Sequence, residues 1–226
     1  MPKKFNDIVN EMDRKIELLG EEIIKNLNLS VEGYCTNKKD ICNLVIYKNN
    51  NIIKNLESLE MYSVKSLCLY RPVSKDLRKL LTIIKLCSML EKIEECAVKI
   101  SFVLLNSKFN FDRNDKYIKR MSSLTEEIIL LSISSYINED INKIDEIYKL
   151  HREIERIFYE EFQRYLARKI FEDIFNVAIV NELTNIGKYL ERCENSANDF
   201  RKEIYFLITG KKMIEGEYAK KIRRDP

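Results

Sequence analysis

Glycine, proline, tryptophan and histidine are scarce in this sequence. Its 226 residues include five Gly, three Pro, one His and no Trp. So few turn-forming residues favour long helices and exclude a sandwich or barrel built from many short strands. With one histidine and no GxSxG, GxGxxG or GxxxxGK[ST] motif, the chain is poorly supplied for hydrolytic or nucleotide-driven catalysis. We therefore expect an all-α protein that is not an enzyme and binds no organic cofactor.

Long apolar runs are also lacking. No run of about 18 apolar residues occurs, and the N-terminal stretch has no apolar segment typical of a signal peptide. We expect a cytoplasmic protein without direct membrane insertion. The six cysteines form no CxxC pair, and several fall at apolar helical positions, which favours buried, reduced thiols over disulfides or a zinc site. The six cysteines are Cys35, Cys42, Cys68, Cys87, Cys96 and Cys193.

The composition is that of a globular protein, with 45% hydrophobic and 33% charged residues. Residues 211–226 carry six Lys and Arg against three Asp and Glu, so the first 210 residues hold 33 of each sign. Because neutralising phosphate groups requires clustered basic charge, this balance argues against nucleic acid as a ligand. We interpret residues 211–226 as a solvated basic tail.

Clusters of turn-forming residues divide the rest of the chain into six predicted helices. Pro72 suits the first turn of a helix, where its missing N–H is not needed, and Gly210 suits a helix end. The predicted helices are Phe5 to Leu27, Asp40 to Leu69, Pro72 to Asn106, Asn114 to Ile137, Asp140 to Leu166, and Phe171 to Thr209.

The third and sixth predicted helices share one apolar pattern at an offset of 100 residues. Its members are spaced alternately by three and four, which is typical of a helix packed in a left-handed bundle. They are Ile83, Leu86, Leu90, Ile93, Ala97, Ile100 and Leu104, and then Leu183, Ile186, Leu190, Cys193, Ala197, Phe200 and Ile204. Agreement along a whole helix indicates an internal duplication. The sequence thus predicts two tandem three-helix bundles, residues 1–110 and 111–210, followed by the tail 211–226.

Two carboxylates lie one turn apart on the third predicted helix. Glu91 and Glu95 point the same way, opposite the Leu90 seam. Such carboxylates repel one another unless a proton or a cation lies between them, and oxygen ligands suit Mg²⁺, Mn²⁺ or iron. The alternative is an ordinary surface ion pair, because Glu95 also precedes Lys99 by four residues.

The equivalent positions in the second repeat are less acidic. Glu191 and Asn195 take the places of the two glutamates, and Asp199 lies one turn further on. A cation would bind more weakly here or use Asp199, and this polar side could also simply face water.

The single histidine supports no catalytic site. We expect His151 to be a partly exposed residue on a helix surface, with Glu155 one turn away as its partner. A ferritin-like di-iron site needs an ExxH pair, and Tyr148 occupies the acidic position.

Segments in both repeats resemble motifs of the PhoU proteins, which are accessory regulators of bacterial phosphate uptake. YRPVSKDLR at residues 70–78 is similar to the family's RQPVAxDLR. LEKIEECAVKI at 90–100 and LERCENSANDF at 190–200 are similar to LERIGDHAxNI, and YFLITG at 205–210 resembles a family helix that ends in TG. The resemblance covers both repeats, with the segments in the right order.

The resemblance implies a fold of two three-helix bundles, a homodimer and action through protein contacts. The implied partners are the ATPase subunit of the phosphate ABC transporter and the phosphate-sensing histidine kinase. At high phosphate such proteins are thought to damp both, which implies a negative regulator of phosphate uptake and of phosphate-starvation signalling.

The resemblance also implies metal binding. In that family the ExxxD pair of each repeat is implicated in multinuclear metal clusters, which nominates Glu91 with Glu95 and Glu191 with Asn195 for iron, manganese, magnesium or zinc. The chain departs from the motif, because Glu95 and Asn195 replace the family's Asp, and Glu94 and Glu194 replace its Gly.

Two other functions fit the same residues. The first is a metal-binding or storage protein whose carboxylate faces hold the metal as their main task. The second is a helical adaptor for another phosphate carrier.

Overall fold

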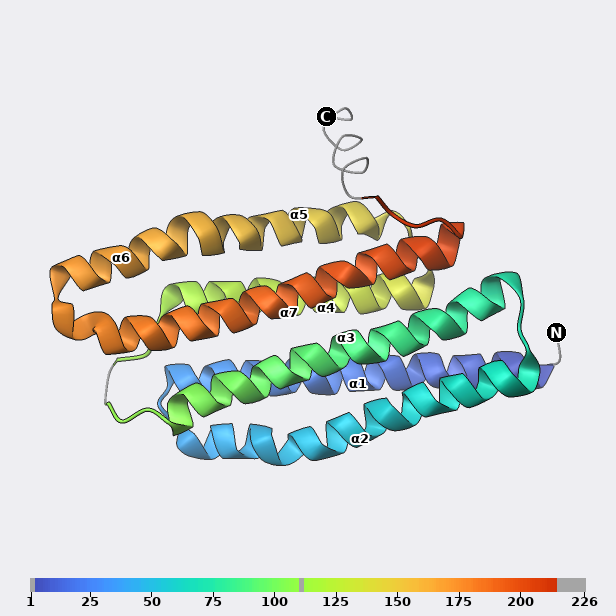
Figure 1. Ribbon diagram of the computed structural model, residues 1–226, viewed down its shortest axis with the longest axis horizontal. Helices are drawn as coiled ribbons and strands as arrows, with labels where there is room; N and C mark the ends of the chain where they lie inside the picture. The colour runs from blue at the N-terminus through green and yellow to red at the C-terminus, as the bar shows by residue number, and fades with distance from the viewer. Residues whose placement is uncertain (1–2, 110–111, 215–226) are drawn as a thin grey trace.

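The computed structural model describes residues 3–109 and 112–214, and helices make up nearly all of this part of the chain (Figure 1). The described residues contain no strand. The elements are α1 Lys3–Cys35, α2 Lys39–Tyr70, α3 Ser74–Leu105, α4 Lys116–Asn138, α5 Lys143–Arg156, the π-helical turn η1 Ile157–Phe162, α6 Gln163–Glu172, the 3₁₀ turn η2 Ile174–Asn176, and α7 Val177–Thr209. Among the described helices, none is both long and apolar enough to cross a membrane.

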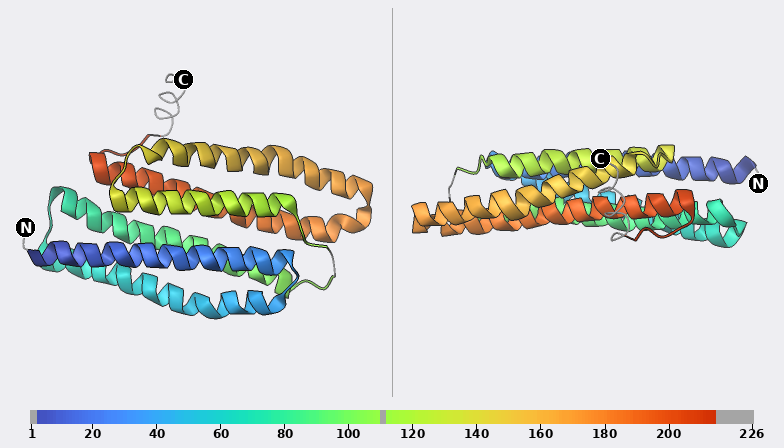
Figure 2. Two further views of the ribbon diagram at one scale, coloured as in Figure 1. Left: turned by 180° about the vertical axis from the view of Figure 1, so that it is seen from behind. Right: turned by 90° about the horizontal axis from the view of Figure 1, so that it is seen from above.

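The helices form two three-helix bundles that lie side by side. In the first repeat α1, α2 and α3 pack together, and in the second α4 and α7 pack with the rod formed by α5, η1 and α6. The two repeats meet where α3 lies against α7 and α1 lies beside α4 (Figures 1 and 2). The predicted all-α fold of two tandem bundles is therefore confirmed.

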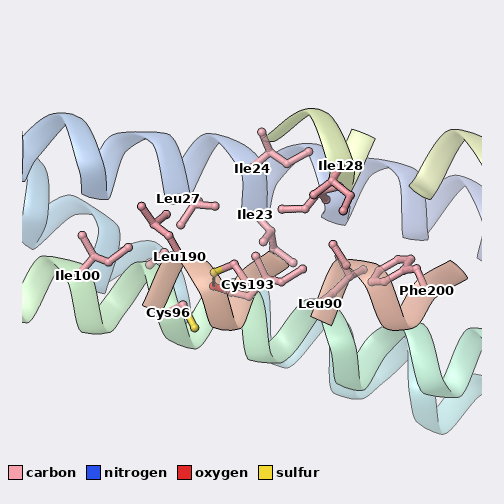
Figure 3. Packing of buried hydrophobic residues seen from close by; sticks show 14 of the residues in the cluster. Ile23, Ile24, Leu27, Leu90, Cys96, Ile100, Ile128, Leu190, Cys193 and Phe200 are labelled. Carbon is pink, nitrogen blue, oxygen red and sulfur yellow. Dashed lines mark hydrogen bonds between the residues drawn. The ribbon is translucent and has the colours of Figure 1, made fainter. Parts of the chain in front are cut away.

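The shared apolar pattern forms the core of this interface. All fourteen members of the two seams are buried, with at most 1% of any side chain exposed. Figure 3 shows side chains from α3 and α7 meeting those of α1 and α4 between the repeats. The spacing of three and four residues predicted this face correctly, because helix periodicity alone places these positions on one side.

The first helix is longer than predicted. The expected break between Leu27 and Asp40 shrinks to Thr36, Asn37 and Lys38, and α1 continues to Cys35. Leu27, Val31 and Tyr34 are buried at helical spacing, so tertiary packing outweighs the weak helix propensity of the neighbouring Asn and Ser residues.

Two other boundaries also differ. The helix predicted to start at Pro72 starts at Ser74, because Arg71 adopts a left-handed conformation that closes α2 and Val73 stays extended. The break expected near residues 167–171 lies at 173–176 instead, where the Asp173 side chain accepts a hydrogen bond from the Phe175 N–H. Gly210 closes α7 at φ 71°, as expected.

The middle rod of the second repeat contains a π-helical turn. Within η1, Phe158 and Phe162 are buried against Gly187 of α7. A Cβ atom added at Gly187 would lie 2.5 Å from the Phe162 ring. The glycine therefore permits the close approach of α7 to this rod.

Candidate functional site on the carboxylate faces

The carboxylates predicted on α3 lie at its surface. Glu91 is half-buried, and Glu95 is 45% exposed. The Glu95 carboxylate accepts a hydrogen bond from Lys99 Nζ at 3.1 Å. Arg192 of α7 approaches the same oxygen at 3.9 Å. Two cationic side chains thus surround Glu95, and one of them comes from the opposite repeat.

The predicted residues of α7 have other partners. Asn195 donates a hydrogen bond to Glu191 at 2.7 Å, and Tyr159 of η1 donates to the same carboxylate oxygen at 3.2 Å. Asp199 forms an ion pair with Lys202 at 2.8 Å. These contacts join the polar groups of the second repeat to each other.

The two faces do not form a cation site within one chain. Over residues 3–109 and 112–214, no three His, Cys, Asp or Glu side chains gather closely enough to hold a metal ion. Lys99 and Arg192 also supply positive charge where a cation would have to sit at Glu95. Metal binding at these faces therefore stays a prediction from the sequence.

A fully buried carboxylate lies beside Glu95 and was not predicted. Glu94 accepts a hydrogen bond from Asn26 Nδ2 of α1 at 2.5 Å, and the same amide group donates to the Val45 carbonyl of α2 at 3.3 Å. The second Glu94 oxygen and Asn26 Oδ1 have no partner. Burial raises the pKa of Glu94 to about 7, partly offset by the hydrogen bond from Asn26.

The second repeat also contains a fully buried glutamate, which has a different partner. Glu194 is fully buried and contacts His151 Nδ1 of α5, while Glu155 lies 3.7 Å from His151 Nε2. Burial raises the pKa of Glu194, and the hydrogen bond with His151 opposes that rise. The expectation of a partly exposed His151 is wrong, because only 8% of it is exposed, although Glu155 is indeed a neighbour.

A sequence signal for both buried glutamates existed. Glu94 follows Leu90 by four residues and precedes Ala97 by three, which places it on the apolar face. Glu194 has the same spacing from Leu190 and Ala197. A carboxylate at such a position is easily taken for a surface residue, since few charged side chains are fully buried.

Two buried tyrosines connect the repeats. Tyr34 of α1 donates a hydrogen bond to Glu182 of α7 at 3.2 Å, and Tyr136 of α4 donates one to Asp13 of α1. Burial, reinforced by the neighbouring carboxylate, raises the pKa of both hydroxyls, so both remain protonated donors.

Each of these carboxylates also has a cationic partner. The buried Arg113 guanidinium donates to Glu182 at 3.1 Å, and the Lys79 ammonium lies 3.1 Å from Asp13. Lys79 Nζ also lies 3.9 Å from the centre of the Tyr136 ring. The charges of the buried Glu182 and the half-buried Asp13 are therefore compensated by neighbouring cations.

A family model described as the PhoU domain matches the chain twice, over residues 16–103 and 118–200. The chain belongs to the PhoU family. The two matches fall on the two repeats, so the PhoU domain includes the third and last long helices with their carboxylate faces.

Known proteins agree with this placement. The chain is 23% identical over 213 residues to the phosphate-specific transport system accessory protein PhoU homolog 1 of Thermotoga maritima, which covers 90% of this chain and 91% of that protein. It is 98% identical over 129 residues to an uncharacterized protein of Methanocaldococcus jannaschii, which covers 57% of this chain and 99% of that protein. The crystal structure of the phosphate transport system regulatory protein PhoU from Streptococcus pneumoniae shares the fold, with a TM-score of 0.84, 18% identity, and coverage of 93% of this chain and 99% of that one.

Proposed function

We propose that this PhoU-family protein is an accessory regulator of phosphate transport that acts through protein contacts rather than catalysis. The observation that carries the proposal is the family match to both repeats. Relatives that align with nearly the whole chain bear the name of phosphate-specific transport accessory proteins, which supports the same role here.

The finer proposal concerns direction and partners. In high phosphate the protein would damp the phosphate ABC transporter through its ATPase subunit, and would damp starvation signalling through the phosphate-sensing histidine kinase. Both partners follow from the resemblance of the motif segments to the PhoU family. Action on an ATPase subunit would place the protein in the cytoplasm, as we expect from the sequence.

The turn between α6 and α7 offers a surface for such a contact. Its large apolar side chains are exposed to solvent: Phe171 is 92% exposed, Phe175 84% and Ile174 68%. Burying such side chains against a partner would be favourable. Adjacent exposed apolar residues of this kind mark protein interaction sites, where aromatic side chains are enriched. We assign this end of the second repeat to the contact with the transporter.

The decisive experiment is genetic. A strain lacking this gene, grown with ample phosphate, should take up phosphate without restraint and switch on a phosphate-starvation reporter. Restoring the wild-type gene should reverse both changes. If neither uptake nor the reporter responds to the deletion, the regulatory proposal is wrong even though the fold is shared. If only another phosphate carrier responds, the protein is an adaptor for that carrier.

Metal dependence and self-association belong to the same proposal and need separate measurements. Metal analysis of protein purified without chelators should find at least one equivalent of metal per chain if the carboxylate faces bind metal. Glu91→Ala should then lower that content, with Glu57→Ala on α2 as a surface control. Sedimentation of the same sample should report a dimer.

A further inference from the structure

Two cysteines from opposite repeats meet at the centre of the interface between the bundles. Cys96 belongs to α3 and Cys193 to α7, and both are fully buried. The two thiols are neighbours in this core. Figure 3 shows the two side chains in the core between α3 and α7. The chain thus brings two sulfur atoms together from positions almost 100 residues apart.

The backbones of the two helices also approach closely at this point. Cys193 Sγ lies 3.9 Å from the carbonyl oxygen of Ile93, which is one turn before Cys96. The adjacent seam positions Ala97 and Ala197 are small and fully buried, so little side-chain volume separates the helices here. Disulfide bonds require such proximity, because the Cβ atoms of a bonded pair are roughly 4 Å apart.

The other cysteines are placed differently. Cys35 contacts the backbone of Asp115, Cys42 contacts the Ser101 side chain, and Cys68 is exposed on α2. A second thiol as a neighbour therefore distinguishes Cys96 and Cys193 from these three.

We propose that Cys96 and Cys193 are an oxidisable pair that closes a disulfide bond between the two repeats. The oxidant is a low-molecular-weight disulfide. The thiolate of one cysteine attacks a sulfur of this disulfide, which breaks the S–S bond and releases one small thiol after protonation. The second cysteine, as its thiolate, then attacks the mixed disulfide and releases the other small thiol. Two protein thiols lose two electrons and two protons, and the small disulfide gains them.

The bond would fix α3 against α7. Because both sulfurs are buried, the small disulfide can reach them only when this interface opens, and the product then prevents further opening. Oxidation would therefore also fix Glu95 of α3 relative to Arg192 of α7, which face each other at the rim of the same interface.

Refolding in a thiol–disulfide buffer tests the proposal without depending on access to the core. The full chain is unfolded, refolded in mixed oxidised and reduced glutathione, and digested without reduction for mass spectrometry. We expect one peptide pair linked through Cys96 and Cys193, and a fall in free thiols from six to four. The loop closed by this bond is about 100 residues long, so the midpoint of thermal unfolding should rise by roughly 10 °C and return on reduction.

Alanine variants show which thiols are responsible. Cys96→Ala and Cys193→Ala should each abolish the linked peptide and the rise in midpoint. Cys87→Ala, which removes another buried thiol of α3, should retain both. If the wild-type chain refolds with six free thiols, or with glutathione attached to Cys96 and no link to Cys193, the proposal is overturned. A link between any other pair would overturn it as well.

Discussion

Replacing Glu94 with glutamine should make the protein less sensitive to pH. The folded state holds a proton on this buried carboxyl up to about pH 7, whereas the ordinary pKa is 4.5. Between these values the folded state binds more protons than the unfolded state, so stability falls as the pH rises. Each pH unit changes the free energy of unfolding by about 1.4 kcal/mol, so the loss amounts to about 3 kcal/mol.

Glutamine is the right replacement because it keeps the local hydrogen bond. Its carbonyl oxygen can accept from Asn26 Nδ2 as Glu94 does, and its NH₂ group gives the unpartnered Asn26 Oδ1 a donor. Glu94→Gln should therefore resemble the protonated wild type at low pH. Its advantage over wild type should grow from about pH 4.5 and level off above about pH 7, which corresponds to about 6–12 °C in the unfolding midpoint.

Urea unfolding measured at several pH values between about 4.5 and 8 provides the assay. Glu95→Gln is the matched control, since it removes a neighbouring carboxylate that is 45% exposed and should leave the pH dependence unchanged. A difference between Glu94→Gln and wild type that stays constant across this range would refute the reasoning. It would mean that Glu94 is charged when buried or is not buried in solution.

Three further predictions concern other parts of the molecule. Gly187→Ala should destabilise the fold by about 1–3 kcal/mol in urea unfolding, because the added methyl meets a buried phenylalanine ring, and unchanged stability would contradict this packing. Arg113→Met should lower the free energy of unfolding by about 3–5 kcal/mol, because it leaves Glu182 buried without its cation. Adding Glu182→Leu should recover part of that loss. If the double variant is as destabilised as Arg113→Met alone, the pairing is wrong. Phe175→Ser should weaken transporter regulation in the uptake assay without changing the unfolding midpoint, while Leu69→Ser, an exposed apolar change at the far end of α2, should leave regulation intact.

Helix positions and the shared seam were predictable because both depend on local periodicity. The end of α1 was not, since Asn26 and Gly33 suggest a turn and only the partners packed around them show that the helix continues. The π-helical turn has no local signal of its own. Its two buried phenylalanine rings pack against Gly187, which lies on another helix.

The candidate site shows the same limit. The one-turn spacing of Glu91 and Glu95 could be read from the chain, but the approach of Arg192 depends on how α7 crosses α3. The burial of His151 likewise depends on Glu194, which is 43 residues away in the sequence. Contacts between different helices decide the electrostatics of these faces, and the periodicity of one helix carries no information about them.

The crossed tyrosines make the two repeats complementary rather than interchangeable. Tyr34 of the first repeat completes the hydrogen bonding of a carboxylate in the second, and Tyr136 of the second does so for Asp13 in the first. A pair of identical first repeats would have Tyr34 but no Glu182 for it to meet, and a pair of second repeats would lack Asp13. The duplicated halves have thus become a matched pair, in which each half supplies a hydrogen-bond donor to a carboxylate of the other.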